Sequence, residues 1–548
     1  MRNEETNIVL KKPHATNKAM TIAQAVLLND WNSWKQVRSL WLELIIDGLM
    51  KDYDSKQKLS VIFAQNYQEI VEDYYCDDQE RESSIMSLSV QIFTVPSLAH
   101  HLIEKCDAMS KMLRGNVYNA LFYFAPQILI SGFITLLSEN KDESGALDFN
   151  AWVVEERSEF QRGLMSLYDL TYLLSVVPEP ERWTDALRTN FRNGAVKVLE
   201  VLSMMQGMDQ MKRQTGQHVE MEDNGWKLTY ELQHHFGEVV RLVTAWAVSD
   251  KSVMLQLVDE TLKLITLKHP SEALKEKSKY LAFLGPPKIY ELIDFDVTLE
   301  KISLNVPLHR FLISLLIESP RHGLETSLSQ RINNSVSSLQ LLEPVLQTVV
   351  AVAQISIGMW KRNGSSAESQ AFLYNSKKYC PGLKDSDLMM MQMVAAMSDD
   401  VDTLLVTILA RFKLTKWASG DIENEPKARS ADFIEHCNGL ADQWLGLMIA
   451  LTAERFIPGI GVGVDQRAAL RQEVIQLLCT EHLPHSKIVK HFPEKKNEKE
   501  LYDVLREIAT LKASTKDVGK KVYHLKEGFE EKYNMFHYGY TREQQTQA

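Results

Sequence analysis

The sequence predicts a mainly α-helical protein, a multi-helical scaffold followed by a C-terminal winged-helix domain with a small β-ribbon. Apolar residues recur at three- and four-residue spacing along most of the 548 residues. Alternating apolar and polar residues, the pattern of a half-buried strand, are nearly absent before roughly the last 60 residues. Near the C-terminus, three helical stretches precede two short runs typical of strands. This order of elements is that of a winged helix.

Apolar stripes define the helices of the body. One stripe comprises Leu164, Leu167, Tyr168, Leu170 and Leu174, and another comprises Leu308, Phe311, Leu312, Leu315 and Leu316. No repeat period is strong enough to define a solenoid, although a stack of helical hairpins suits the pattern. We expect a helical scaffold over residues 1–300, a second helical part over 301–463, the winged helix over 464–540 and a tail over 541–548.

The sequence around residue 350 indicates where one helix begins and where it ends. Pro344 is suited to the first position of a helix, where its missing N–H costs nothing, and the apolar run continues to Trp360. Lys361 and Arg362 then stand where cations favour a helix C-terminus, and Asn363-Gly364 can adopt a left-handed stop. This stretch therefore predicts a buried helix and its cap.

The winged helix is predicted from apolar spacing and from breakers. The expected helices cover 467–478, 485–492 and 497–511, and the expected strands cover 521–525 and 533–538 on either side of Gly528. The third helix carries four acids and two bases, which leaves a charge of −2. Most non-specific affinity for nucleic acid comes from basic residues that neutralise phosphates, and a negative helix would be repelled. We therefore expect no nucleic-acid partner and favour a winged helix that docks on protein.

Composition points to a protein of a reducing compartment. The net charge is −11, which offers no attraction for phosphate backbones or anionic lipid. The five cysteines, with no paired zinc-ligand spacing, are Cys76, Cys106, Cys380, Cys437 and Cys479. An odd and sparse count also argues against a secreted disulfide framework. We therefore expect a protein of the cytosol, or also of the nucleus.

No targeting or membrane segment is expected. Met1–Lys18 lacks the apolar core of a signal peptide. Gly115–Ser138 carries no charge and is long enough to span a bilayer, but Asn116, Pro126 and other polar or helix-breaking residues interrupt it. Two buried helices that meet near Pro126 are the favoured interpretation, with a transmembrane span as the alternative.

Several residue groups resemble functional sites. Cys479, His482 and His485 have ligand-like spacing, but Pro484 breaks their register and no fourth ligand is near, so a helix end and turn is favoured over zinc. Gly459–Gly463 lacks the spacing and the lysine of a nucleotide-binding loop, and a connector is the simpler interpretation.

Histidines and methionines also have structural interpretations. His309 and Arg310 follow a proline at a helix start, where His309 is expected toward a flank with a capping or packing role in preference to a catalytic one. The rings of His100-His101 and of His234-His235 are expected to diverge on their helices. Met389–Met391 predicts an adaptable core helix, with partner binding as the alternative.

The sequence thus offers no catalytic, cofactor-binding or metal-ligating residues, and no nucleophile motif is found. Several ordered blocks nevertheless resemble the middle region of the N-recognin E3 ubiquitin ligases of the UBR-box family. These blocks are Leu88–Leu102, Met205–His218, Ile302–Arg310, Val352–Gly364, Lys384–Gln392, Leu409–Leu414 and Thr452–Phe456.

The resemblance implies a function in the N-degron pathway, by which substrates are ubiquitinated and degraded by the proteasome. In that family a zinc-containing UBR box and a ClpS-like domain read N-degrons, and a RING domain recruits the E2 enzyme. This chain has neither the UBR box nor the RING, so no family site residue carries over and zinc is expected only in those domains. We expect this chain to be a scaffold portion that transfers no ubiquitin by itself. Its partners, an E2 enzyme and N-degron substrates, are expected to bind through the complete ligase. The alternatives are a stand-alone interaction module or truncated competitor and, third, a nucleic-acid-binding winged helix.

Overall fold

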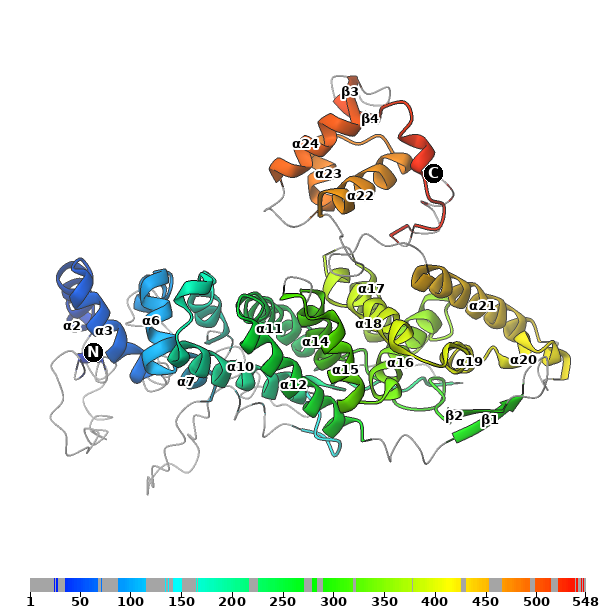
Figure 1. The fold of residues 1–548 in the computed structure, drawn as a ribbon, viewed down its shortest axis with the longest axis horizontal. Coiled ribbons are helices and arrows are strands. Elements are labelled where there is room, and N and C mark those ends of the chain that lie inside the picture. The colour runs from blue at the N-terminus through cyan, green and yellow to red at the C-terminus, as the bar shows by residue number, and fades with distance from the viewer. Residues whose placement is uncertain are drawn as a thin grey trace. The chain divides into compact units, whose positions relative to one another are not determined.

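The computed structural model describes most of the chain. The described residues are 35–67, 87–114, 141–149, 166–215, 225–270, 278–282, 289–318, 322–376, 378–424, 430–452, 466–492, 498–513, 521–537 and 539–540, with a few single residues outside these ranges. The chain divides into two compact units. Unit 1 comprises Met1–Glu139, Val153–Val198 and His234–Trp246, and unit 2 comprises the remainder. The mainly helical fold predicted from the sequence is confirmed (Figure 1).

Unit 1 is built from short helices and one end of two long ones. Its elements are α2 (Lys35–Leu44), η2 (Ile45–Leu49), α3 (Tyr53–Gln65), α5 (Leu88–Phe93), α6 (Pro96–Cys106), α7 (Ala108–Arg114), η5 (Pro180–Arg182), most of α10 (Asp185–Met205) and part of α11 (Gly225–Ala247). The predicted stripe at 164–174 is buried, except that Tyr168 is exposed.

Trp246 is the centre of an aromatic cluster in unit 1. Its indole stacks on Phe191 with ring centroids 5.2 Å apart and meets Trp183 edge-on at 6.0 Å. The ring of His100 also meets it edge-on, at 5.2 Å. The indole N–H donates to the carbonyl of Leu174 at 2.9 Å, so the buried polar atom is satisfied.

Two helical glycines of unit 1 provide a matched pair of substitutions. A Cβ on Gly194 of α10 would lie 2.4 Å from the Cβ of Met109, whereas a Cβ on Gly237 of α11 would meet nothing within 4 Å. We expect Gly194→Ala to destabilise unit 1 by about 1–3 kcal/mol because of overpacking. Gly237→Ala should stabilise it by about 0.5–1 kcal/mol. Thermal melting of both variants checks this, and stabilisation by Gly194→Ala would contradict the close approach of α7 and α10.

Unit 2 contains a helical body around α16 (Ser338–Ser356). Helices α12 (Lys251–Lys268), α17 (Ser366–Asn375), α18 (Lys384–Met397), α19 (Val401–Arg411) and α21 (Ala431–Thr452) all contact α16. The shorter elements are α14 (Pro307–Ile317), α15 (Glu325–Ser335), η7 (Cys380–Gly382), α20 (Thr415–Ala418) and η8 (Asp421–Asn424). By length and composition alone α16 could cross a membrane, but 72% of its apolar window is buried inside the protein. The Gly115–Ser138 prediction falls almost entirely outside the described residues.

The prediction that Pro344 begins a helix is wrong. The helix begins at Ser338, because Ser337 and Gln340 form a reciprocal capping box, and Pro344 lies inside it. The helix also ends at Ser356, before the predicted stop at Asn363-Gly364. Gly358 already has a left-handed backbone with φ of 81°, which turns the chain early.

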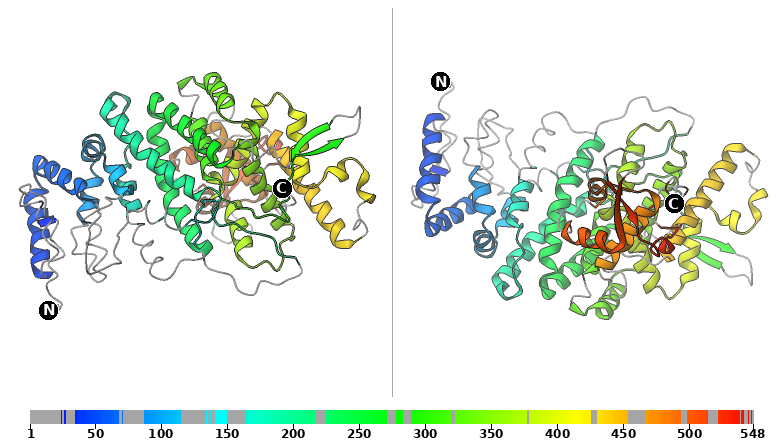
Figure 2. Two further views of the ribbon diagram at one scale, coloured as in Figure 1. Left: turned by 90° about the horizontal axis from the view of Figure 1, so that it is seen from below. Right: turned by 90° about the horizontal axis from the view of Figure 1, so that it is seen from above.

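A β-hairpin in unit 2 was not predicted. β1 (Ser278–Ala282) pairs antiparallel with β2 (Ile289–Ile293), and the two strands appear as adjacent arrows in Figure 2. The sequence does contain a signal, since Gly285-Pro-Pro287 separates two runs rich in tyrosine, leucine and isoleucine. The strands are too short for their alternation to stand out from the surrounding helical pattern.

The winged-helix prediction is confirmed in its helices and revised in its ribbon. The helices are α22 (Gln466–Thr480), α23 (His485–His491) and α24 (Glu498–Ile508), and β3 (Ala509–Ala513) pairs with β4 (Lys521–Leu525). The third helix therefore ends before Leu511, which belongs to the ribbon.

The strand predicted at 533–538 is not formed over its described residues, 533–537. The buried side chain of Gln476 instead binds this segment, since its Nε2 donates to the carbonyl of Lys532 and its Oε1 accepts from the N–H of Asn534. These hydrogen bonds occupy backbone groups that a strand would need for pairing.

Candidate functional site

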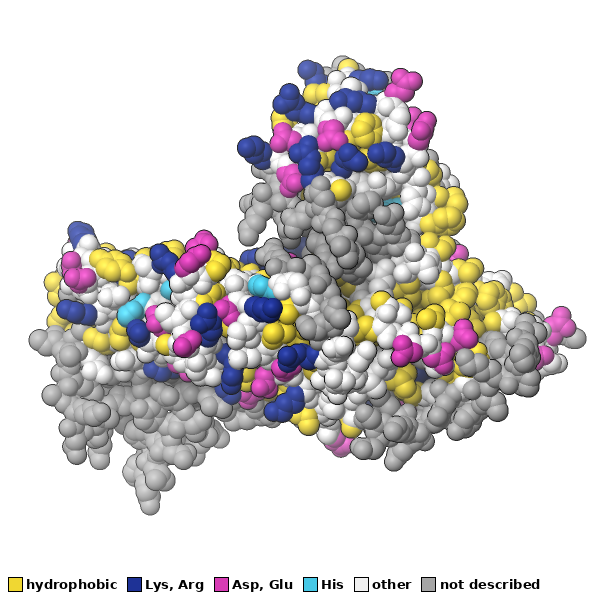
Figure 3. Space-filling model, in the orientation of Figure 1, with side chains coloured by type: hydrophobic (Ala, Val, Ile, Leu, Met, Phe, Trp, Pro, Cys, Tyr) yellow, Lys and Arg dark blue, Asp and Glu magenta, His cyan; other side chains and the backbone are white. Residues whose placement is uncertain are grey.

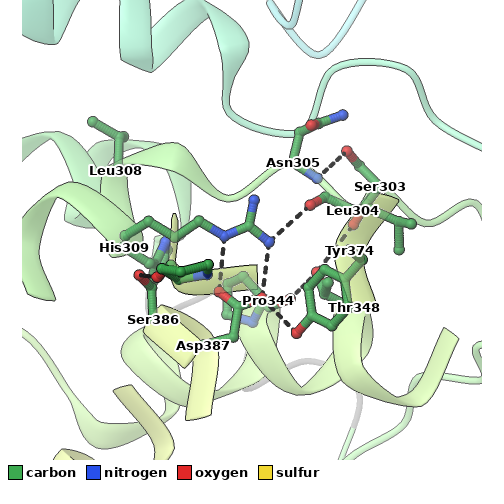
Figure 4. A network of polar contacts seen from close by, with 12 residues as sticks. Ser303, Leu304, Asn305, Leu308, His309, Pro344, Thr348, Tyr374, Ser386 and Asp387 are labelled. Carbon is green, nitrogen blue, oxygen red and sulfur yellow. Dashed lines mark hydrogen bonds and ion pairs between the residues drawn. The ribbon is translucent and has the colours of Figure 1, made fainter. Parts of the chain in front are cut away.

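A buried ion pair joins two of the sequence blocks in unit 2. Arg310 of α14 donates from Nε to Oδ1 of Asp387 at 2.9 Å and from Nη2 to Oδ2 at 2.8 Å, a bidentate geometry (Figure 4). Nη2 also donates to the carbonyl of Leu304 at 3.0 Å. The hydroxyl of Tyr374 on α17 donates to Oδ2 of Asp387 at 2.9 Å. We call Arg310, Asp387 and Tyr374 the clamp, because it ties α14, α17 and α18 together.

The electrostatics of the clamp favour the charged pair. Burial alone would lower the pKa of the Arg310 guanidinium, but the adjacent Asp387 carboxylate outweighs it and raises that pKa. Burial and then Asp387 raise the pKa of the Tyr374 phenol well above its usual value, so the hydroxyl keeps its proton. Arg310 is 9% exposed and Asp387 is fully buried. The clamp therefore has a structural function, because its polar atoms bind one another and are closed to solvent.

A second buried group forms around His309. Pro344 has no N–H, so the carbonyl of Gln340, four residues earlier, loses its helical hydrogen bond. Nε2 of His309 donates to this carbonyl at 3.0 Å, since a carbonyl oxygen only accepts. Nδ1 of His309 then faces the amide nitrogen of Gln206 at 3.4 Å. The predicted flank position of His309 is wrong, because the ring is buried where it satisfies the carbonyl freed by Pro344.

A third buried pair anchors the hairpin. Glu343 of α16 binds Arg411 of α19. Arg411 also donates to the carbonyls of Ile293, the last residue of β2, and of Phe295 just after it. Gln347 donates to Glu343 at 3.2 Å. Burial raises the pKa of Glu343, and the charge of Arg411 opposes this. Both side chains are nearly inaccessible, so the pair holds α16, α19 and β2 in fixed register.

The described part of the Met205–His218 block, residues 205–215, connects two further blocks. Met211 forms two backbone hydrogen bonds with Ile302, of 2.7 and 2.8 Å. Arg213 donates from Nε to the carbonyl of Met359 at 2.7 Å. Asn363 also binds the backbone of Gln214, in both directions. This segment therefore lies against the 302–310 block and against the turn after α16.

Four of the blocks quoted for the family resemblance thus meet through polar contacts, and a fifth, at 409–414, joins α16 through the pair of Arg411 and Glu343. They span residues 205 to 414, and their contacts centre on α16 and α14. We call these contacts the block network. The sequence suggested packing helices and caps for these blocks. The sequence did not show that Arg310 pairs with Asp387 or that Glu343 pairs with Arg411. The available signal was the presence of charged residues within otherwise apolar helical runs.

The other candidate residues lie apart from this network. His482 stacks on His524 of β4 with centroids 3.7 Å apart, and His485 lies beside Tyr523, while burial raises the pKa of the Cys479 thiol. Among the residues that the structure describes, no group of three His, Cys, Asp or Glu side chains is arranged to hold a metal. Gly459–Gly463 lies outside the described residues.

The remaining histidines and methionines have structural contacts. His100 binds the carbonyl of Val176 at 2.9 Å, and the ring of His235 meets Tyr168 edge-on. The expectation that the rings of His234 and His235 diverge is wrong, because their centroids lie 5.1 Å apart. Met389–Met391 are buried in α18, in agreement with a core helix.

The buried histidines give unit 2 a defined pH dependence. Burial, then the neighbouring His269, lowers the pKa of His309 to about 3, and burial lowers that of His269 to about 4. The unfolded chain binds protons at these groups below about pH 6.5, whereas the folded chain does not. Each histidine should therefore cost about 2 kcal/mol of stability at pH 5 relative to pH 8. In urea titrations across this range, the free energy of unfolding should fall less toward acid in His309→Gln than in the wild type. An equal pH dependence in the two proteins would contradict the burial of His309.

Asp169 in unit 1 provides an internal control, because its contribution to stability changes with pH in the opposite direction to that of the histidines. Burial raises the pKa of Asp169 to about 6, although Tyr67 donates a hydrogen bond to it at 2.6 Å. The folded state therefore holds this proton above the usual pKa of an aspartate, and this contribution to stability declines as the pH rises from about 4 to 6. Asp169→Asn should remove the decline in unit 1 and leave the acid dependence of unit 2 unchanged.

Comparison with known proteins places this architecture in a family. The model for a UBR1/2/3-like ARM repeat domain matches residues 17–435, and the model for a winged-helix domain like that of E3 ubiquitin-protein ligase UBR1 matches residues 469–548. The E3 ubiquitin-protein ligase UBR2 of Homo sapiens is 30% identical over 533 residues, which are 96% of this chain and 29% of that protein.

Other relatives match a similar share of this chain. UBR1 of Drosophila melanogaster is 29% identical over 95% of this chain and 28% of its own length, and ubr1 of Schizosaccharomyces pombe is 21% identical over 95% and 25%. The chain thus spans less than a third of the length of these relatives. The stack of helices corresponds to ARM repeats, for which the sequence showed no clear period. Since the ARM-repeat model covers more than half of the residues, the chain belongs to the UBR family of N-recognin E3 ubiquitin ligases and comprises their ARM-repeat body and winged-helix domain.

Proposed function

We propose that this chain is the scaffold portion of an E3 ubiquitin ligase of the N-degron pathway. The observation that carries the proposal is the block network, in which separate segments of unit 2 are joined by two buried ion pairs and by the half-buried contact of Arg213 with the backbone of Met359. Such contacts resist local deformation, because each broken pair leaves a buried charge or an unsatisfied carbonyl. A body of this kind suits the positioning of other modules better than it suits chemistry.

Positioning contributes to ubiquitin transfer through geometry. A substrate lysine must meet the thioester of a charged E2, and fixed orientation of two reactants lowers the entropic part of the barrier. The scaffold would hold substrate-reading and E2-recruiting modules at a set separation. E2 enzymes and N-degron substrates are therefore proposed as partners of the complete ligase, with zinc confined to its UBR box and RING. The proposed location is the cytosol, or also the nucleus.

A chimera tests the scaffold function. In the UBR1 relative of Drosophila melanogaster, the aligned segment is replaced by this chain or by a Gly/Ser linker of equal length. We expect the first chimera to ubiquitinate an N-degron substrate and the second to lose most of that activity, because a flexible linker lowers the effective concentration of the modules. Equal activity of the two chimeras would contradict positioning.

The isolated chain provides the complementary measurement. Incubated with E1, a charged E2, ATP and an N-degron substrate, the purified 548-residue chain is expected to transfer no ubiquitin. The complete relative serves as the positive control. Substrate-linked ubiquitin formed by the chain alone would show that catalytic parts lie within it.

A further inference from the structure

α21 exposes apolar side chains on one side. Ile434 is 47% exposed and Leu445 is 48% exposed. They are 11 positions apart in the chain, which is close to three helical turns, so both project from the same side of the helix. Ile449, one turn beyond Leu445, is half-buried on that side. A helix at a protein surface usually presents polar residues to water, so this side departs from the common pattern.

α20 continues the apolar surface. Trp417 is 36% exposed, and its ring lies edge-on to that of Trp444 on α21 with centroids 6.1 Å apart. The contact joins the two helices, and we call their exposed side the α20–α21 surface. Figure 3 shows apolar side chains gathered over the region of α21, with acidic side chains beside them.

The border of this surface is acidic. The exposed acids within the described residues 415–424 and 430–452 are Asp421, Glu423, Asp432, Glu435 and Asp442. Lys416 is the exposed base of the same ranges, so five acids and one base give a formal charge of −4. Glu435 and Asp442 lie on the same half of α21 as Ile434 and Leu445, since their positions fall within about a third of a helical circle.

We propose that the α20–α21 surface binds an amphipathic, basic helix of a partner protein. Leucine-like side chains of such a helix would cover Ile434, Leu445 and Trp417. Its lysines or arginines would face the acidic border, which adds orientation and a faster association rate. An anionic membrane or a nucleic acid would be repelled by the same acids. The binding does not depend on ubiquitin transfer.

A defined peptide tests the proposal with the full chain. The probe is a short fluorescent peptide of leucine and lysine, with leucines at i, i+4, i+7 and i+11, and a second peptide has glutamate in place of lysine. Anisotropy titrations compare the wild type with Leu445→Gln and Glu435→Lys. The matched control is Leu267→Gln, since Leu267 is 68% exposed near the end of α12. Circular dichroism confirms that each variant is folded.

The expected result is binding of the lysine peptide that weakens as salt is added. Leu445→Gln and Glu435→Lys should each raise its Kd about tenfold, and Leu267→Gln should leave it unchanged. Absence of binding, equal loss in the control variant, or equal binding of the glutamate peptide would overturn the proposal. A wild-type dimer that dissociates in Leu445→Gln would assign the surface to a second copy, which would overturn it as well.

Discussion

Replacement of Asp387 by alanine should destabilise unit 2 by about 3–5 kcal/mol. The substitution leaves the Arg310 guanidinium buried without its carboxylate and removes the acceptor of the Tyr374 hydroxyl. The cost of an uncompensated buried charge exceeds the net benefit of the pair, so the effect is larger than that of a surface salt bridge. Urea titration followed by circular dichroism should show an earlier transition for the variant.

The double variant Arg310→Met, Asp387→Leu is the control. Removal of both charges leaves no unpaired ion, and apolar side chains of similar size can fill the space. We expect the free energy of unfolding to fall by much less than the sum of its decreases in Arg310→Met and Asp387→Leu alone. This difference defines a favourable coupling energy between the two side chains. Additive losses would show that Arg310 and Asp387 do not act as a pair.

The second large effect is expected in unit 1. Trp246→Ala should cost about 3–5 kcal/mol, because it empties a site that contacts Phe191, Trp183 and His100 and frees the carbonyl of Leu174. Thermal unfolding of the variant should shift the transition of unit 1. Hydrogen exchange in α6, which belongs to unit 1, separates this transition from that of unit 2.

Trp246→Phe is the conservative partner of this variant. Phenylalanine keeps the stack on Phe191 but loses the indole N–H, so a smaller loss of about 1–3 kcal/mol is expected. Losses of equal size in the two variants would mean that the hydrogen bond to Leu174, and not the aromatic packing, dominates at this site.

Much of the fold follows from local patterns. The stripe of α14 and the helices of the winged helix lie where the three- and four-residue spacing predicts them, although α14 also buries His309, Arg310 and Ile313 outside its stripe. The start of α16 was missed because Pro344 is compatible with two positions. The capping box of Ser337 and Gln340 fixes the helix start at Ser338, so Pro344 lies in the interior. The helical hydrogen bond that Pro344 removes from the carbonyl of Gln340 is replaced by one from His309, which lies 31 residues before Gln340.

The candidate site depends on pairings that spacing does not specify. Arg310 and Asp387 are 77 residues apart, and nothing in either helix identifies the partner. Charged residues in apolar runs indicate that some partner exists, since an unpaired buried charge is too costly. The identity of that partner requires the tertiary arrangement of α14, α16 and α18. The family resemblance, in contrast, was recognisable from the blocks themselves and is confirmed by the family models.

Hydrogen exchange followed by mass spectrometry tests the block network most directly. In Asp387→Ala, protection should fall together in 205–215, 302–310, 352–364 and 384–392, because these segments are joined by buried and half-buried contacts. Unit 1 should keep its protection and serves as the internal reference. Loss of protection confined to the neighbourhood of residue 387 would contradict a body held as one by these contacts.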